Sequence, residues 1–219
     1  IGLANALSWQ GEFEEALRIN ARAGDLAVDQ GYSVLAAQAH GSIGQLELLR
    51  GRPERALPEL LTACRLFEQA GGLPQRMVEA EIALADAYLA VNLLREAAAL
   101  AERVIARAAE LDLPAEQARA HLQRALARAA LGDVASARDD VTTARGLFAA
   151  QDNPASAALA SLGAAALDLR QGQFDLALAA AEAAAQVFTS VGIPGWQAEA
   201  ELIAAGACVA AGAAAEARA

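Results

Sequence analysis

Few residues of this 219-residue sequence have side chains that could act as nucleophiles, general bases or metal ligands. Its only histidines are His40 and His121, and its only cysteines are Cys64 and Cys208. A catalytic or metal site needs its groups within a few ångströms of one another, and these residues lie far apart in the sequence. We therefore expect no catalytic residue, no metal site and no cofactor. The cysteines are predicted to be small buried residues.

Carboxylates are abundant, but none stands out as one member of a general acid and base pair. Many lie at predicted helix starts or on solvent faces, often with an arginine three or four residues away. Examples are Glu12, Glu14, Glu15, Asp139 and Asp140. Helix dipoles and surface ion pairs account for such placement. The Gly-Ser-Ile-Gly stretch at residues 41–44 lies inside a predicted helix without a preceding strand, so it cannot bind phosphate as a dinucleotide fingerprint does. The sequence predicts that this segment is not an enzyme.

The composition excludes further classes of function. All 17 basic residues are arginines, 27 residues are acidic, and the net charge is −10, which disfavours a nucleic-acid partner. The longest apolar run, residues 202–215, is shorter than the about 20 residues that span a membrane, so no membrane partner is expected. The chain begins at Ile1 without an initiator Met, which we interpret as an excerpt from a longer, cytoplasmic protein.

Glycine recurs at a fixed interval along the chain. The recurring positions are Gly11, Gly51, Gly132, Gly172 and Gly212, and Asn92 occupies the one vacant place between Gly51 and Gly132. Successive positions are 40 or 41 residues apart. Glycine and asparagine are the residues that most readily take the left-handed conformation that ends a helix. The spacing therefore predicts a turn between two helices at each position.

Proline and alanine recur in the same register. Pro74, Pro114, Pro154 and Pro194 are each 40 residues apart, and each follows a short break in the helical pattern. Proline is well tolerated in the first turn of a helix, so a helix is predicted to begin at each one. Pro58 is the exception: we expect it to kink its helix or to delay the start past Pro53. Five residues after each turn residue stands an alanine: Ala16, Ala56, Ala97, Ala137, Ala177 and Ala217.

Each unit therefore consists of a first helix of about 17 residues, a turn, a second helix of similar length and a tight break. Apolar pairs recur in the second helices and are predicted to form the core: Leu66 with Phe67, Leu147 with Phe148, and Val187 with Phe188. A single helix pair cannot bury its apolar stripe alone and must stack on its neighbour. The sequence predicts an all-α fold, a solenoid of about five and a half helix pairs in a single domain over residues 1–219.

These units resemble the tetratricopeptide repeat. The order of small residue, turn residue and alanine is carried by Gly44, Gly51 and Ala56, and the family's leucine-to-tyrosine element matches best at residues 84–88. Other units hold other residues in the tyrosine place: Leu7, Glu47, Arg128, Asp168 and Cys208. The resemblance implies a right-handed superhelix with a concave groove lined by the first helices, in which a partner peptide or helix binds.

Three segments resemble the repeat region of bacterial CHAT-domain proteins, which precedes a caspase-like peptidase domain. They are residues 88–97, 148–154 and 187–194. This resemblance implies that the parent protein carries such a domain downstream and that the present segment is a non-catalytic scaffold regulating it. The repeat arms of large LuxR-type and MalT-like transcription regulators are also similar, so a ligand-sensing arm is the alternative.

The register of the tetratricopeptide family gives the residues expected in the groove. They are Asn5, Trp9, Gln38, Gln45, Glu79, Asp86, Arg119, Gln123, Arg170 and Glu199. The chain contains no lysine, so the Lys/Asn array that clamps a carboxyl terminus in some members of that family is absent. Trp9 and Trp196 are either partner anchors or caps on the apolar core. Self-association through apolar ends of the solenoid is a further expectation.

Overall fold

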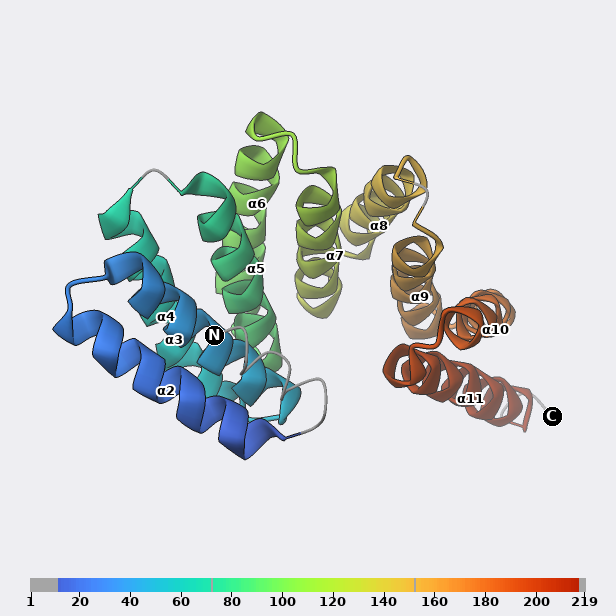
Figure 1. Ribbon diagram of the computed structural model, residues 1–219. Coiled ribbons are helices and arrows are strands. Elements are labelled where there is room, and N and C mark those ends of the chain that lie inside the picture. Colours follow the sequence, from blue (N-terminus) through green and yellow to red (C-terminus); the bar gives the residue numbers. More distant parts are fainter. Residues whose placement is uncertain (1–11, 72, 152, 217–219) are drawn as a thin grey trace. The chain divides into compact units, whose positions relative to one another are not determined.

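A computed structural model describes residues 12–71, 73–151 and 153–216 of the chain. Over these ranges every regular element is an α-helix, and Figure 1 shows the helices in the order of the sequence. They are α2 (Phe13–Asp29), α3 (Ser33–Leu49), α4 (Pro53–Ala70), α5 (Pro74–Ala90), α6 (Leu94–Glu110), α7 (Pro114–Ala130), α8 (Val134–Ala149), α9 (Pro154–Arg170), α10 (Phe174–Val191) and α11 (Pro194–Glu216). The prediction of an all-α fold is confirmed.

The helices are grouped in two compact units, Ile1–Glu116 and Gln117–Ala219. In the first unit each helix from α2 to α6 packs against the next, and α3 also contacts α5. In the second unit α8, α9, α10 and α11 pack in the same consecutive way, and α9 also contacts α11. Within each unit the first helices of neighbouring hairpins therefore lie side by side. The single domain over residues 1–219 stays a prediction.

The turns between paired helices use the residues that the spacing indicates. Gly51, Asn92, Gly132 and Gly172 have φ angles of 67°, 61°, 94° and 74°, which is the left-handed region. The amide of the residue after each turn residue donates to a carbonyl in the last turn of the preceding helix, as Leu93 does to Tyr88 O at 2.8 Å. Gly11 lies outside the described residues.

The predicted turn at Gly212 is wrong, because α11 continues through this residue to Glu216. Gly212 is followed by three alanines, which are the strongest helix formers. A glycine inside a run of strong helix formers can continue the helix at a cost of about 1 kcal/mol relative to alanine, so spacing alone does not make it a turn.

The prolines mark helix starts as predicted: α5, α7, α9 and α11 begin at Pro74, Pro114, Pro154 and Pro194. Pro58 does not delay α4, which begins at Pro53 and contains Pro58 in its interior. Pro58 still accepts a side-chain hydrogen bond at its carbonyl, from Thr62 Oγ1 at 2.9 Å.

Small side chains form much of the core. The described alanines that follow the turn residues by five positions are all completely buried: Ala16, Ala56, Ala97, Ala137 and Ala177. Phe67, Phe148 and Phe188 are buried as predicted for the second helices. Phe188 also meets Trp196 of α11 edge to face, with ring centroids 5.5 Å apart, so Trp196 packs against the core.

One described helix, α10, is long and apolar enough to cross a membrane, judged by its length and composition alone. Only 22% of its residues are buried. Length and composition alone are weak evidence for a membrane span, and α10 packs along both α9 and α11. The absence of a membrane partner stays a prediction.

Gly44 shows how closely paired helices approach. A Cβ atom at Gly44 of α3 would lie 2.5 Å from Cγ and 2.7 Å from Cδ2 of Leu60 on α4. Leu60 is completely buried, so its side chain has little freedom to move away. The packing of α3 on α4 therefore requires a residue without a side chain at this position.

Replacing Gly44 with alanine should lower the free energy of unfolding by about 1–3 kcal/mol, because the added methyl overpacks the contact with Leu60. Gly146→Ala is the matched control, since no atom lies within 4 Å of a Cβ built at this helical glycine. The control should raise stability by about 0.5–1 kcal/mol through helix propensity. Urea unfolding followed by circular dichroism measures both, and equal effects of the two substitutions would contradict the packing argument.

Candidate functional site

The described residues predicted for the groove all lie on first helices. Gln38 and Gln45 are on α3, and Glu79 and Asp86 are on the adjacent α5 in the first unit. In the second unit the predicted residues are placed on three helices: Arg119 and Gln123 on α7, Arg170 on α9, and Glu199 on α11. Asn5 and Trp9 lie outside the described residues. That this set forms a binding groove remains a prediction.

The accessibility of these side chains differs. Those exposed to solvent are Gln45, Glu79, Arg119, Arg170 and Glu199. Gln38 and Asp86 are half-buried, whereas Gln123 is only 5% exposed. Arg170 also contacts the last turn of α7, where its Nη2 donates a hydrogen bond to the carbonyl of Ala129 at 3.2 Å. Gln123 can therefore offer little surface to a partner.

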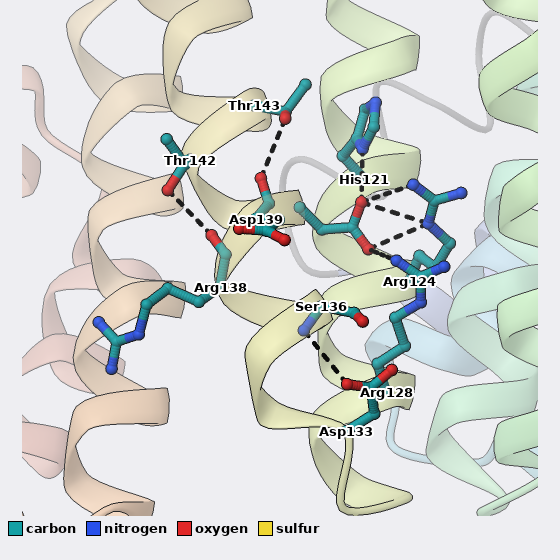
Figure 2. Close-up of polar contacts among 10 residues, drawn as sticks. His121, Arg124, Arg128, Asp133, Ser136, Arg138, Asp139, Thr142 and Thr143 are labelled. Atoms are coloured by element: carbon teal, nitrogen blue, oxygen red, sulfur yellow. Dashed lines mark hydrogen bonds and ion pairs between the residues drawn. The ribbon is translucent and has the colours of Figure 1, made fainter.

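A buried ionic cluster joins α7 to α8 in the second unit (Figure 2). Its centre is Asp140, which is 3% exposed. His121 Nδ1 lies 2.8 Å from Oδ1 of Asp140, and because an ionised carboxylate can only accept, this ring nitrogen carries the proton. Arg124 donates from Nε and from Nη2, the latter at 2.6 Å, and Arg128 Nη1 donates to Oδ2 at 2.8 Å.

Opposing effects act on the pKa of Asp140. Burial raises the pKa, but the hydrogen bonds from His121 and Arg124 and the charges of Arg124 and Arg128 outweigh it and lower the pKa to about 2. The carboxylate is therefore ionised at neutral pH. His121, Arg124 and Arg128 are spaced by three and four residues on one side of α7, so the sequence places all three donors toward α8.

The first unit contains a simpler version of this pair. His40 Nδ1 of α3 lies 2.6 Å from Oε2 of Glu59 on α4, and both side chains are about one-third exposed. The interval from histidine to carboxylate is 19 residues in both units. The sequence alone did not reveal the acidic partners of the two histidines. The shared interval is the signal that could have revealed them.

A buried carboxylate of α5 is paired in another way. Glu81 accepts a hydrogen bond from Arg107 Nη1 of α6 at 2.6 Å. Burial raises the pKa of Glu81 despite the charge of Arg107. Cys64 lies in the same environment, and burial together with the charge of Glu81 raises its pKa to about 12. The thiol therefore stays protonated at neutral pH and is a poor nucleophile.

Cys208 is exposed on α11, so the prediction that both cysteines are buried is wrong for this residue. Its helix has no following second helix among the described residues to cover it. Among the residues that the structure describes, no group of three histidine, cysteine or acidic side chains could hold a metal ion. The clusters of Asp140, Glu59 and Glu81 each join the two helices of one hairpin, and the exposed polar side chains of the first helices are the candidate binding surface.

Comparison with known proteins identifies the fold. No protein-family profile matches the sequence, and no curated protein matches it. Among solved structures, a Rap protein complexed with competence and sporulation factor is similar, with a TM-score of 0.78 and 16% identity. Aspartyl phosphate phosphatase F from Bacillus subtilis has a TM-score of 0.73 and 12% identity. A putative kinesin light chain from Podospora anserina with nearly identical TPR-like repeats has a TM-score of 0.69 and 17% identity.

The alignments cover 91%, 89% and 87% of this chain, respectively. They cover 93% of the kinesin light chain structure but only 56% of the Rap protein and 52% of the phosphatase, so the chain spans about half the length of the latter two. The fold is that of the TPR-like helical repeat proteins. The resemblance to CHAT-domain proteins is not among these findings.

Asp140→Asn should lower stability by about 2 kcal/mol at pH 7, because two partly buried arginines lose their counter-charge. The pKa of Asp140 is lower in the folded than in the unfolded protein. Its contribution is therefore present above about pH 4 and is lost as the pH falls toward 2. The gap between wild type and variant should narrow over this interval in urea unfolding. The exposed neighbour offers a control, Asp139→Asn, which should change stability by less than about 0.5 kcal/mol.

Arg107→Ala should show the opposite pH dependence. Without the arginine the pKa of buried Glu81 rises further, and a raised carboxyl pKa makes the folded state more stable at low pH than at high pH. The variant should therefore lose more stability at pH 7 than at pH 5, which a pair of thermal melts measures. A pH-independent loss would show that Arg107 contributes by packing alone.

Proposed function

We propose that this segment is a non-catalytic scaffold that binds a protein partner, as a peptide or helix, along the surface of its first helices. The observation that carries the proposal is a contrast between positions of the repeat. Positions that pack in the core hold small or aromatic residues in every repeat. The buried alanines that follow the turns are an example. The position thirteen residues before the recurring residues Gly51, Asn92, Gly132, Gly172 and Gly212 holds Gln38, Glu79, Arg119, Leu159 and Glu199.

Packing does not explain this variation, because Glu79, Arg119 and Glu199 are exposed. Within each unit the first helices of neighbouring hairpins lie side by side, so a position that changes charge from one repeat to the next presents different groups next to each other. Such a surface can distinguish between partners by matching charge and hydrogen bonds. An extended peptide or a helix laid across the first helices of one unit would meet these groups in turn.

The Rap structure supports the proposal, because that protein was solved in complex with competence and sporulation factor. In the present chain a bound partner would be recognised without a lysine clamp, since all basic residues are arginines. The net charge of −10 favours a partner with basic residues and disfavours nucleic acid. We place this activity in the cytoplasm.

The proposal extends to an attached effector. The resemblance of the repeats to those of CHAT-domain proteins supports a caspase-like peptidase domain in a longer parent protein, which the scaffold would regulate. The alternative is a ligand-sensing arm of a LuxR-type or MalT-like regulator. The sequence that follows Ala219 in the gene distinguishes the two: a peptidase-like domain favours the first, and a helix-turn-helix favours the second.

Arg119→Glu should reduce capture of the partner by the immobilised chain, because it reverses a charge on the proposed surface of α7. The matched control is Arg145→Glu, the same change at an exposed residue of the second helix α8. A partner retained by wild type in quantitative mass spectrometry should bind at least about tenfold more weakly to the first variant and unchanged to the control. Retention by both variants, or loss from both, would show that the first helices do not bind it.

A further inference from the structure

Three residues of the second unit occupy the same position of the repeat and differ in chemistry. They are Arg119 of α7, Leu159 of α9 and Glu199 of α11, and each is 40 residues from the next. Arg119 and Glu199 are exposed, and Leu159 is half-buried. In chain order this position is therefore basic, apolar and acidic. We call these three residues the first-helix row.

The three helices have the same rotation about their axes at this level. The residue that follows each member of the row is a completely buried alanine: Ala120, Ala160 and Ala200. Neighbouring helices also meet here, because Ala118 of α7 belongs to the same buried cluster as Ala160 of α9. Ala158 of α9 and Ala200 of α11 share a cluster in the same way. The members of the row therefore lie side by side on adjacent helices.

The exposure of the row does not come from the point where the sequence ends. Glu79 of α5 and Arg119 of α7 hold this position in hairpins whose second helix is described, and both are exposed. The second helix therefore leaves this position accessible in both hairpins. Glu199 is exposed in α11 for the same reason, since it lies on the side of a first helix that faces away from the second helix.

The distance between members of the row follows from the packing of the helices. Packed helices lie about 8–10 Å apart, and contacts through alanine favour the lower part of this range. A polyproline II chain has three residues per turn, so every third side chain points the same way at intervals of about 9 Å. A β-strand presents the same face at intervals of about 7 Å, and an α-helix at intervals of about 10.5 Å. The polyproline II interval fits the row best.

We propose that the first-helix row binds a polyproline II segment of the partner that carries an acidic, an apolar and a basic residue at every third position. The acidic residue pairs with Arg119, the apolar residue packs on Leu159, and the basic residue pairs with Glu199. Opposite charges at the two ends of the row fix the direction of the segment across the helices. This binding mode rests on the proposed function and gives the partner of the first helices a specific chemistry.

Two fluorescein-labelled peptides serve as probes, Glu-Pro-Pro-Leu-Pro-Pro-Arg and its reverse, Arg-Pro-Pro-Leu-Pro-Pro-Glu. The prolines hold the polyproline II conformation, and the pair covers both chain directions. Fluorescence anisotropy with the 219-residue chain should show saturable binding of one of them. That peptide should bind at least about tenfold more tightly than Leu-Pro-Pro-Glu-Pro-Pro-Arg, which has the same composition but places the apolar residue at one end.

Charge exchange tests each end of the row. Arg119→Glu should weaken binding of the peptide at least about tenfold, and replacing the glutamate of the peptide with arginine should restore binding to this variant but not to wild type. Glu199→Arg should behave in the same way toward a peptide whose arginine is replaced with glutamate. The matched control, Arg145→Glu at an exposed residue of α8, should leave binding unchanged. Circular dichroism should show the helix content of wild type in all three variants, because the substituted residues are exposed.

Three results would overturn this binding mode. The first is no saturable binding of either peptide up to about 1 mM. The second is equal weakening by Arg119→Glu and Arg145→Glu. The third is tighter binding of a helical peptide with the same three residues at every seventh position, because an α-helix would then be the occupant. The proposed function is tested separately by the captured partner: if its capture depends on Arg119 while neither proline peptide binds, the first helices bind the partner in another way.

Discussion

The structure depends on the close approach of paired helices through small side chains. Each helix carries an apolar stripe that only a neighbouring helix can cover, and the distance between the two is set by residues such as Gly44 and Ala56. A bulky residue at these positions would separate the helices and expose the stripe. This constraint fixes a few positions in every repeat and leaves the outward positions free to vary.

Buried carboxylates add a second kind of constraint, which differs from hairpin to hairpin. Asp140 binds His121 and two arginines of α7, Glu81 binds Arg107 of α6, and Asp168 of α9 accepts from Arg138 of α8 at 2.6 Å. A buried charge without its partner is strongly destabilising, so each acid favours one neighbour over the others. We infer that these pairs help to keep helices of similar length and pattern in their proper order.

Much of the fold could be predicted from the sequence because its signals are local. A left-handed turn needs glycine or asparagine and a helix start tolerates proline, so Gly51, Asn92 and Pro74 indicate their roles without any knowledge of distant contacts. The failures involve tertiary context. Gly212 has the right spacing, but α11 continues through it, and the burial of Gln123 depends on how α7 packs. The partner of His121 required two helices to be placed side by side before Asp140 could be recognised.

The fold alone does not determine what is bound. Proteins as different in name as a Rap protein, an aspartyl phosphate phosphatase and a kinesin light chain share this arrangement with the present chain at 12–17% identity. What they share is the arrangement of the helices, so what each one binds must be decided by the residues that this arrangement leaves exposed. In this chain the exposed polar groups on the first helices vary in charge from repeat to repeat, which is the kind of variation that can distinguish one partner from another.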